Sequence, residues 1–262
     1  MNKPSPGNKP SAAAARFRTE AAKRILVTDG AWGTMIQTFG LAEADYAGTL
    51  GLSHEQKGNN DMLCLTRPDI IEKITQGYLD AGSDIVSTNT FSSTTISQAD
   101  YGAEHLVREL NLAAAGIARR AADAAQAKDG RPRFVAGALG PTNKTLSLSP
   151  DVNDPGFREV DYDQVKDVYT QQIQALLDGG VDFILIETIF DTLNAKAAIM
   201  AVLEESDRRG VEIPIMISMT ITDMSGRNLS GHAIDAFWWA VRHAKPLTVG
   251  LNCSFGADLL RP

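Results

Sequence analysis

Polar and small residues follow several apolar runs of this sequence, at the points where buried strands would end. Asp29 and Gly30 follow one such run, Asn89 ends a second in "STNTF", Glu187 follows "FILI", and Cys253 closes "TVGLNC". Carboxylates, an amide and a thiol can together bind a small amine or a metal ion. Because the carboxyl ends of parallel strands share one face, we expect these residues to line one cleft.

Glu187 carries the strongest of these signals. A glutamate after four apolar strand residues is costly to bury unless it meets a cation or several hydrogen-bond donors. A ligand ammonium group would satisfy it, and so would a structural lysine or arginine. Asp29 has the same two readings, because it can cap a tight turn or point into a pocket beside Gly30 and Gly33. The dinucleotide fingerprint GxGxxG is absent.

The remaining candidates are an amide and a thiol. Asn89 can orient a substrate or bridge two loops, whereas Cys253 can be a metal ligand, a nucleophile or a small buried apolar residue. Cys64 precedes a predicted helix and is interpreted as a packed thiol. Asp191 is interpreted as a helix N-cap. The four histidines have no metal-binding spacing, and no GxSxG, P-loop or CxxC motif is present.

Short apolar segments alternate with amphipathic ones along the chain. The spacing predicts helices after Pro68, over roughly residues 104–126 and 162–177, after Asp191, and after Ser230. Six strands are predicted, over residues 25–31, 84–91, 133–140, 183–190, 213–220 and 247–253. Strict alternation of strand and helix indicates a parallel sheet.

The placement of the polar residues favours a barrel. A doubly wound sheet would concentrate them at one switch point, but here they follow strand after strand. We therefore predict an α/β fold of the (β/α)₈ TIM-barrel type with about six βα units in sequential order. The first and last of these strands would be unpaired edges.

Composition excludes several classes of protein. The 262 residues have a formal net charge of −7, which argues against nucleic acid as a partner, and no apolar run could cross a membrane. With two cysteines, a secreted disulfide scaffold is not expected, so the location predicted is cytoplasmic. Residues 1–24 are predicted to form a disordered or short helical extension, and residues 25–262 the barrel domain.

Longer motifs carry a family resemblance. The chain resembles the N-terminal homocysteine-binding module of cobalamin-dependent methionine synthase, a homocysteine S-methyltransferase. The resemblance runs from residue 25 to residue 262, and its most specific parts are "DGAWGTMIQ", "KGNNDMLCLTRPDII", "AGSDIVSTNTFSSTTISQADYG", "GALGPTNKTLSLSPDVNDPGFR", "LIETIFDTLNAKAA", "PIMISMTITDMSGRNLSG" and "GLNCSFGADLLR".

The resemblance implies a role for each candidate residue. Asp29, Gly30, Asn89 and Glu187 would bind homocysteine, and Cys253 would be the first of three zinc thiolates. The other two belong to an adjacent pair near the eighth strand, which no residue here matches. The chain is therefore expected to be a C-terminally truncated module with an incomplete zinc site. The family's frequent double glycine after the aspartate is Gly30-Ala31 here.

The implied activity is zinc-thiolate activation of homocysteine for methyl transfer that yields methionine. Methylcobalamin would be the donor, and the cobalamin- and folate-binding modules of the full enzyme would be the partners. One alternative is a stand-alone thiol methyltransferase that uses betaine or S-methylmethionine. The other is an inactive fragment, because two zinc thiolates are missing. We expect this chain alone to bind little zinc and to be inactive.

Overall fold

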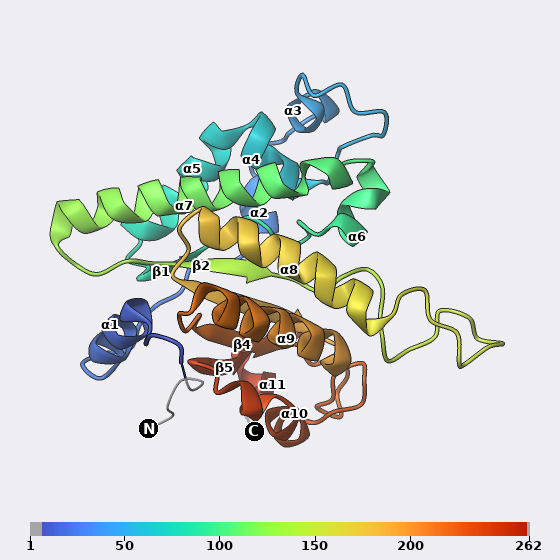
Figure 1. Ribbon diagram of the computed structural model, residues 1–262. Coiled ribbons are helices and arrows are strands. Elements are labelled where there is room, and N and C mark those ends of the chain that lie inside the picture. Colours follow the sequence, from blue (N-terminus) through green and yellow to red (C-terminus); the bar gives the residue numbers. More distant parts are fainter. Residues whose placement is uncertain (1–6, 261–262) are drawn as a thin grey trace.

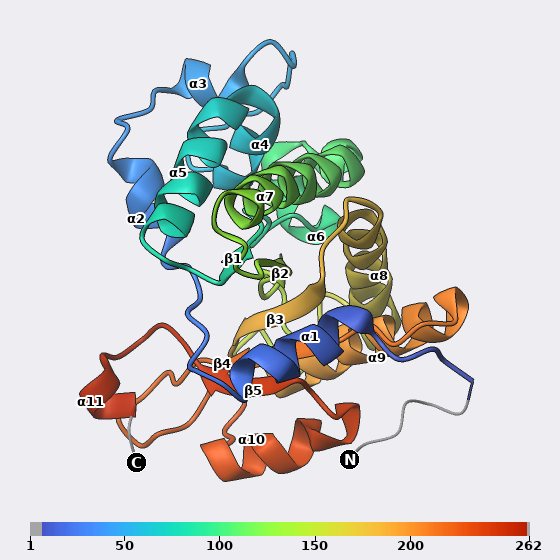
Figure 2. The same cartoon turned by 90° about the vertical axis from the view of Figure 1, so that its left-hand side faces the viewer.

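A computed structural model describes residues 7–260 of the chain and contains one five-stranded parallel sheet (Figure 1). The strands are neighbours in the order in which they occur in the sequence, as predicted, with no switch point. They are β1 (Ile85–Ser87), β2 (Phe134–Leu139), β3 (Phe183–Ile189), β4 (Ile215–Met219) and β5 (Thr248–Leu251). The sheet curls into a half-barrel, which confirms the predicted fold class (Figure 2).

Helices connect the strands and cover the outer face of the sheet. The five predicted helical segments correspond to α5 (Pro68–Asp80), α7 (Val107–Asp129), α8 (Tyr162–Asp178), α9 (Thr192–Arg209) and α10 (Ile234–Val241). Shorter helices lie elsewhere, and these are α1 (Ala12–Ala21), α2 (Trp32–Gln37), α3 (Glu43–Ala47), α4 (Leu63–Thr66), α6 (Thr95–Gln98) and α11 (Ala257–Leu260).

Local sequence signals fix the ends of the long helices. Pro68 occupies the first turn of α5, where its missing N–H is not needed. A capping box formed by Asp161 and Gln164 begins α8. Asp191 caps α9 by accepting a hydrogen bond from the backbone N–H of Leu193, which confirms its interpretation as an N-cap.

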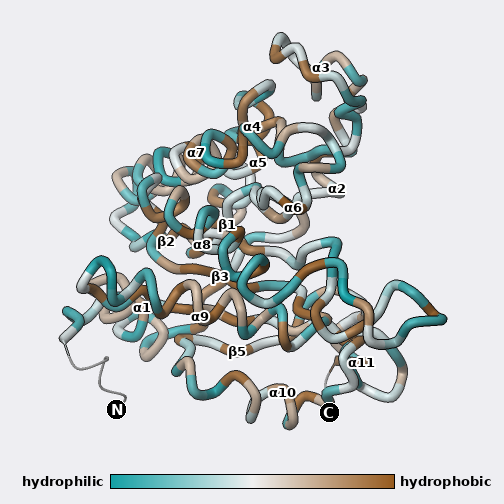
Figure 3. Tube along the Cα trace, turned by 45° about the vertical axis from the view of Figure 1, so that its right-hand side comes forward, coloured by the Kyte–Doolittle hydropathy of each residue, from teal (hydrophilic) through white to brown (hydrophobic). Residues whose placement is uncertain are grey.

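The main core lies between the sheet and helices α8 and α9. Its side chains are almost all branched aliphatic or alanine, as in Ile173, Ile184 and Val202. Figure 3 shows hydrophobic residues concentrated along β2 and β3. Strand β2 is buried along its whole length, which explains its continuously apolar sequence, whereas β3 has half-buried residues where it lines the cavity.

Helix α1 covers the amino-terminal end of the sheet. Phe17 packs there against the rings of Phe134 and Phe183, with centroids 5.9 and 5.5 Å away. The carboxylate of Asp84 is fully buried between Arg24 and Arg131 and ties the segment after α1 to β1. The prediction for residues 1–24 falls partly on residues 1–6, outside the described part, and the boundary at residue 25 stays a prediction.

The predicted strand over residues 25–31 is wrong. Thr28 makes a single parallel bridge to Ile85, but no continuous ladder forms. Backbone hydrogen bonds join the Asp29 N–H to the Ile85 carbonyl and the Ile85 N–H to the Val27 carbonyl, whereas the Val27 N–H donates to the Asp84 carboxylate, so the backbone pairing stops there. Ile25 is 87% exposed, because within residues 7–260 no further strand lies beside this segment. The sheet therefore has five strands rather than six.

Candidate functional site

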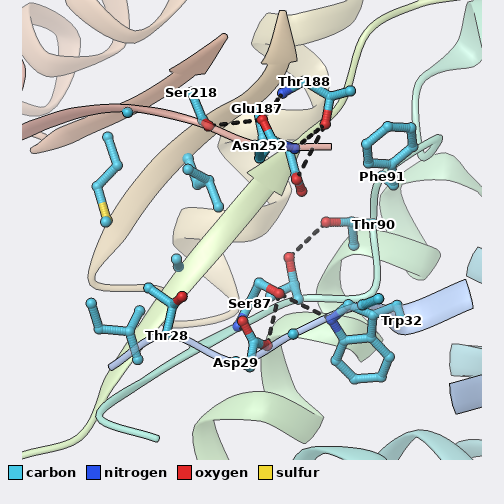
Figure 4. A pocket seen from close by; sticks show the side chains of 18 of the residues that line it. Thr28, Asp29, Trp32, Ser87, Thr90, Phe91, Glu187, Thr188, Ser218 and Asn252 are labelled. Atoms are coloured by element: carbon cyan, nitrogen blue, oxygen red, sulfur yellow. Dashed lines mark hydrogen bonds between the residues drawn. The ribbon is translucent and has the colours of Figure 1, made fainter. Parts of the chain in front are cut away.

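A cavity of about 1310 Å³ opens on the inner side of the half-barrel and reaches the carboxyl ends of its strands. All five residues that sequence reasoning selected line it, namely Asp29, Gly30, Asn89, Glu187 and Cys253. In Figure 4 a group around Asp29 and a group around Glu187 lie on opposite sides of this cavity. Residues from four separate segments therefore lie around one cavity, as their positions at strand ends predict, while their roles in binding stay predictions.

Asp29 is held by the end of β1. Its Oδ2 accepts hydrogen bonds from the N–H and the hydroxyl of Ser87, at 2.7 and 2.8 Å. The indole N–H of Trp32 donates to the same hydroxyl group at 2.9 Å. Burial nevertheless dominates over these hydrogen bonds and raises the pKa of Asp29 to about 6.

Gly30 lies close to the side chain of Tyr78. A Cβ atom at this position would lie 3.1 Å from the Tyr78 hydroxyl, which itself donates to the carbonyl of Ala31 at 2.9 Å. Ala31 has an ordinary extended backbone with φ −65°. A side chain at position 30 would therefore crowd Tyr78, whereas alanine at position 31 causes no strain.

Asn89 joins the β1 end to the segment before α4. Its Nδ2 donates to the carbonyl of Asn60 at 2.8 Å, and the Cys64 thiol donates to the Asn89 carbonyl at 3.4 Å. Cys64 is buried, which confirms its interpretation as a packed thiol, and burial raises its pKa. Part of the Asn89 amide is thus already used for structure, while the residue still lines the cavity.

The loop of residues 88–94 that carries Asn89 is held by buried side chains on both sides. Three amide side chains donate to its backbone carbonyls, namely Gln172 to Thr90, Gln98 to Ser92 and Asn111 to Ser93. The Oδ2 of Asp61 accepts from the Ser92 N–H and the Ser93 hydroxyl at 2.7 and 2.8 Å. The loop is therefore fixed without any ligand.

Asp61 is a site residue that sequence reasoning missed. It is buried, it lines the cavity, and burial raises its pKa to about 6. Its position in the turn "GNND" gave no separate signal, because its partners lie some thirty residues further along the chain. With Asp29 and Glu187 it makes three carboxylates around one cavity.

Glu187 is half-buried at the end of β3. Burial, together with the negative charges of Asp29 and Asp61, raises its pKa to about 7. Its carboxylate accepts one hydrogen bond from the described residues, from the Thr188 hydroxyl at 3.5 Å. Within residues 7–260 no lysine or arginine pairs with it, so the structural cation considered for Glu187 is not found in this part of the chain.

The two basic residues that line the described cavity are already engaged at its amino-terminal end. Lys23 pairs with Glu20, and Arg24 pairs with the buried Asp84. The carboxylates at the opposite end are therefore not neutralised by them. A small ligand with an ammonium group would supply the missing charge.

Cys253 lies at the cavity mouth with its thiol exposed. Asn252 Nδ2 donates to its sulfur at 3.2 Å, and the Thr188 hydroxyl lies 4.0 Å from it. No group of three histidine, cysteine, aspartate or glutamate side chains suited to a metal ion occurs among the described residues. Cys253 as a zinc ligand therefore stays a prediction, and the described donor set does not make a complete zinc site.

Comparison with known proteins identifies the family. Residues 26–262 match the homocysteine S-methyltransferase family. The fold is similar to that of the homocysteine methyltransferase MmuM from Escherichia coli in its metallated form, with a TM-score of 0.71 and 20% identity over 93% of this chain and 80% of that one. The oxidized form of the same protein gives a TM-score of 0.70 with 20% identity, covering 90% of this chain and 76% of that one. None of the helices in residues 7–260 is long and apolar enough to cross a membrane.

Proposed function

The chain belongs to the homocysteine S-methyltransferase family, and we propose that it binds homocysteine for methyl transfer as the substrate module of a cobalamin-dependent methionine synthase. The observation that carries the proposal is that three carboxylates line the cavity and that no lysine or arginine among the described residues pairs with them. The ammonium group of an amino acid would lower the pKa of Glu187 and Asp29 on binding and would stabilise their charged forms.

The other predicted residues fit the remaining parts of homocysteine. Gly30 lines the cavity wall with its backbone, and a Cβ atom there would point toward Tyr78. Asn89 offers a fixed polar group on the opposite loop. We assign substrate binding to Asp29, Gly30, Asn89 and Glu187, with the two carboxylates on the amino group. Cys253 at the mouth marks the end of the cavity toward which the substrate thiol would point.

The chemistry requires a thiolate, because a free thiol is mostly protonated at neutral pH. A bound zinc ion would deprotonate the homocysteine thiol and hold it for attack on an electrophilic methyl group. Cys253 is the residue of this chain that we assign to such an ion. Since the described residues offer one thiolate only, we assign no reaction step to zinc in the chain alone.

The proposal also names a methyl donor and partner modules. The motifs "KGNNDMLCLTRPDII" and "SPDVNDP" favour methylcobalamin and the cobalamin- and folate-binding modules of methionine synthase. The likeness to MmuM is a likeness of fold at 20% identity, and it leaves the donor open. Purified chain should therefore be assayed for methionine formation from methylcobalamin, betaine and S-methylmethionine, with and without separately supplied cobalamin-binding module.

Calorimetric titration tests the substrate assignment directly. L-homocysteine should bind under reducing conditions, whereas 4-mercaptobutanoate, which lacks the amino group, should bind at least tenfold more weakly. Glu187→Gln should remove most of this difference, because it removes a charge that faces the ammonium group. Equal binding of both ligands to the unmodified chain would refute the carboxylate assignment.

A further inference from the structure

Residues with left-handed backbone conformations meet at the mouth of the cavity. Thr188 has φ +56°, Cys253 has φ +60° and Ser254 has φ +59°. Apart from Lys245, these are the only non-glycine residues with positive φ in the described part of the chain. A left-handed conformation costs about 1–2 kcal/mol in an L-residue and is rarest for β-branched ones such as threonine.

The irregularity at Thr188 changes where its side chain points. The pairing of β3 with β4 shifts register between Ile186 and Ile189, which places Glu187 and Thr188 inside an irregular stretch. Such bulges redirect side chains and recur beside active sites. Here neighbouring strand residues that would ordinarily face opposite sides can both reach the cavity, and both line it.

The redirected hydroxyl is part of a continuous set of hydrogen bonds, and Figure 4 shows its members Glu187, Thr188, Ser218 and Asn252. Asn252 Nδ2 donates to Thr188 Oγ1 at 2.7 Å and to Cys253 Sγ at 3.2 Å. Thr188 Oγ1 in turn donates to Glu187 Oε2 at 3.5 Å. The sulfur of Cys253 is thereby connected to the carboxylate of Glu187 through one amide and one hydroxyl.

The amide of Asn252 is itself fixed in one orientation. Its Oδ1 accepts from the Thr188 N–H at 3.1 Å and from the Ser218 hydroxyl at 2.8 Å. With the oxygen committed to two donors, the NH₂ group must face Thr188 Oγ1 and Cys253 Sγ. Asn252 thus links the ends of β3, β4 and β5.

We propose that Thr188 and Asn252 are positioning residues that set the spacing between the Glu187 carboxylate and the Cys253 sulfur, and thereby select homocysteine over the shorter cysteine. The inference rests on the proposed function, in which Glu187 meets the substrate amino group and the thiol points toward Cys253. Homocysteine has one methylene more than cysteine between these two groups. A rigid spacing rejects the shorter ligand, and one methylene is commonly worth 10–200-fold in binding.

Paired substitutions of Thr188 test this proposal. Thr188→Ser keeps the hydroxyl, whereas Thr188→Val keeps the shape and the β-branch but removes the hydroxyl. Thr75→Val on α5 makes the same chemical change at a buried site outside the cavity and serves as the control. If Thr188→Val does not fold, Thr188→Gly removes the hydroxyl and also suits a positive φ.

Two measurements are made on each variant. The first is the dissociation constant for L-homocysteine and for L-cysteine. We expect Thr188→Val to weaken homocysteine binding at least tenfold and to bring the two constants closer together, with Thr188→Ser and Thr75→Val within about threefold of the unmodified chain. The second is hydrogen exchange of the Asn252 side-chain amide by nuclear magnetic resonance, assigned from its loss in Asn252→Asp. In Thr188→Val the Asn252 side-chain amide should no longer be protected from exchange.

The outcomes separate the two proposals. Unchanged homocysteine affinity and selectivity in Thr188→Val would overturn the positioning role while leaving the proposed function standing. If the unmodified chain binds no homocysteine, the proposed function fails and with it the selection of homocysteine. The hydrogen-exchange measurement then tests only the hydrogen bond from Asn252 to Thr188. If the Asn252 side-chain amide stays protected in Thr188→Val, that hydrogen bond is refuted as well.

Discussion

The Glu187 carboxyl is more stable protonated in the folded chain than in the unfolded chain, since its pKa is raised from 4.5 to about 7. The folded state therefore holds this proton more tightly, and the associated stability is present at low pH. It is lost progressively as the pH rises from about 4.5 through 7. Glu187, which we assign to substrate binding, thus destabilises the ligand-free protein at neutral and higher pH.

Glu187→Gln should therefore stabilise the ligand-free chain at pH 8 by about 1–2 kcal/mol and change little at pH 5. This stabilisation is smaller than the full pKa shift implies, because the Glu187 side chain faces the open cavity and is partly solvated. Thermal unfolding at the two pH values measures the difference. A substitution that destabilises equally at both would show that Glu187 has a structural partner instead.

Cys253 yields a prediction about metal content. Because the sequence holds two cysteines and Cys64 is buried against Asn89, only the Cys253 sulfur is accessible to a metal ion. A single sulfur with weak additional ligands binds zinc far less tightly than a three-thiolate set. Metal analysis of the purified 262-residue chain should therefore find well below one zinc per molecule. A full equivalent that disappears in Cys253→Ala would contradict this.

At the scale of elements, Asp191 does more than cap α9. Its Oδ2 also accepts from the backbone N–H groups of Leu146 and Ser147 at 3.1 and 2.8 Å, and its Oδ1 accepts from the Ser147 hydroxyl. One buried carboxylate therefore begins a helix and fixes the long loop after β2. Arg158 fastens the same loop by donating to the carbonyls of Leu146 and Ser147.

Asp191→Ala should cost about 2 kcal/mol of unfolding free energy, since it removes a cap and leaves the Ser147 N–H without its acceptor, whereas the Leu146 N–H still has Asn194 Oδ1 at 2.9 Å. Urea denaturation measures the loss, and limited proteolysis should cut within residues 148–157 sooner. Asp161→Ala is the matched control, because Asp161 caps α8 without holding a distant loop. It should cost about 1 kcal/mol. Equal losses would mean that the loop contacts contribute nothing.

Elements with their own local signals could be predicted from the sequence, whereas contacts between distant segments could not. The helix after Pro68 and the cap at Asp191 follow from capping and periodicity. Residues 25–31 have the composition of a strand, but a strand also needs a partner along its length. The part played by Asp61 depends on Ser92 and that of Thr188 on Asn252, and no spacing in the sequence reveals such pairs.

The whole molecule has an open edge at β5. This strand pairs with β4, and within residues 7–260 its other side has no partner strand. Its residues are half-buried or exposed, in contrast with the buried residues of β1 and β2, and Val249 is 40% exposed. An exposed strand edge with apolar side chains is a template for association with other chains.

We therefore expect the chain to associate with itself as its concentration rises, and Val249→Lys to reduce this association. A lysine on an edge strand opposes pairing with a second edge by charge repulsion and desolvation. Sedimentation velocity over a range of concentrations measures the effect. Val152→Lys, at a valine that is 96% exposed in the loop after β2, is the control for added charge. If Val249→Lys and Val152→Lys reduce self-association equally, the β5 edge is not the surface through which the chains associate.

The fixed loop of residues 88–94 has a calorimetric consequence for the molecule as a whole. Asn111 and Gln172 donate to two carbonyls of this loop. The side-chain oxygen of each is buried without a hydrogen-bond partner among the described residues, so ordering the loop costs folding free energy. A loop that is ordered beforehand contributes no folding transition when a ligand arrives. The heat capacity change of homocysteine binding should therefore be small and reflect the ligand's own apolar surface, without the large negative value of coupled folding.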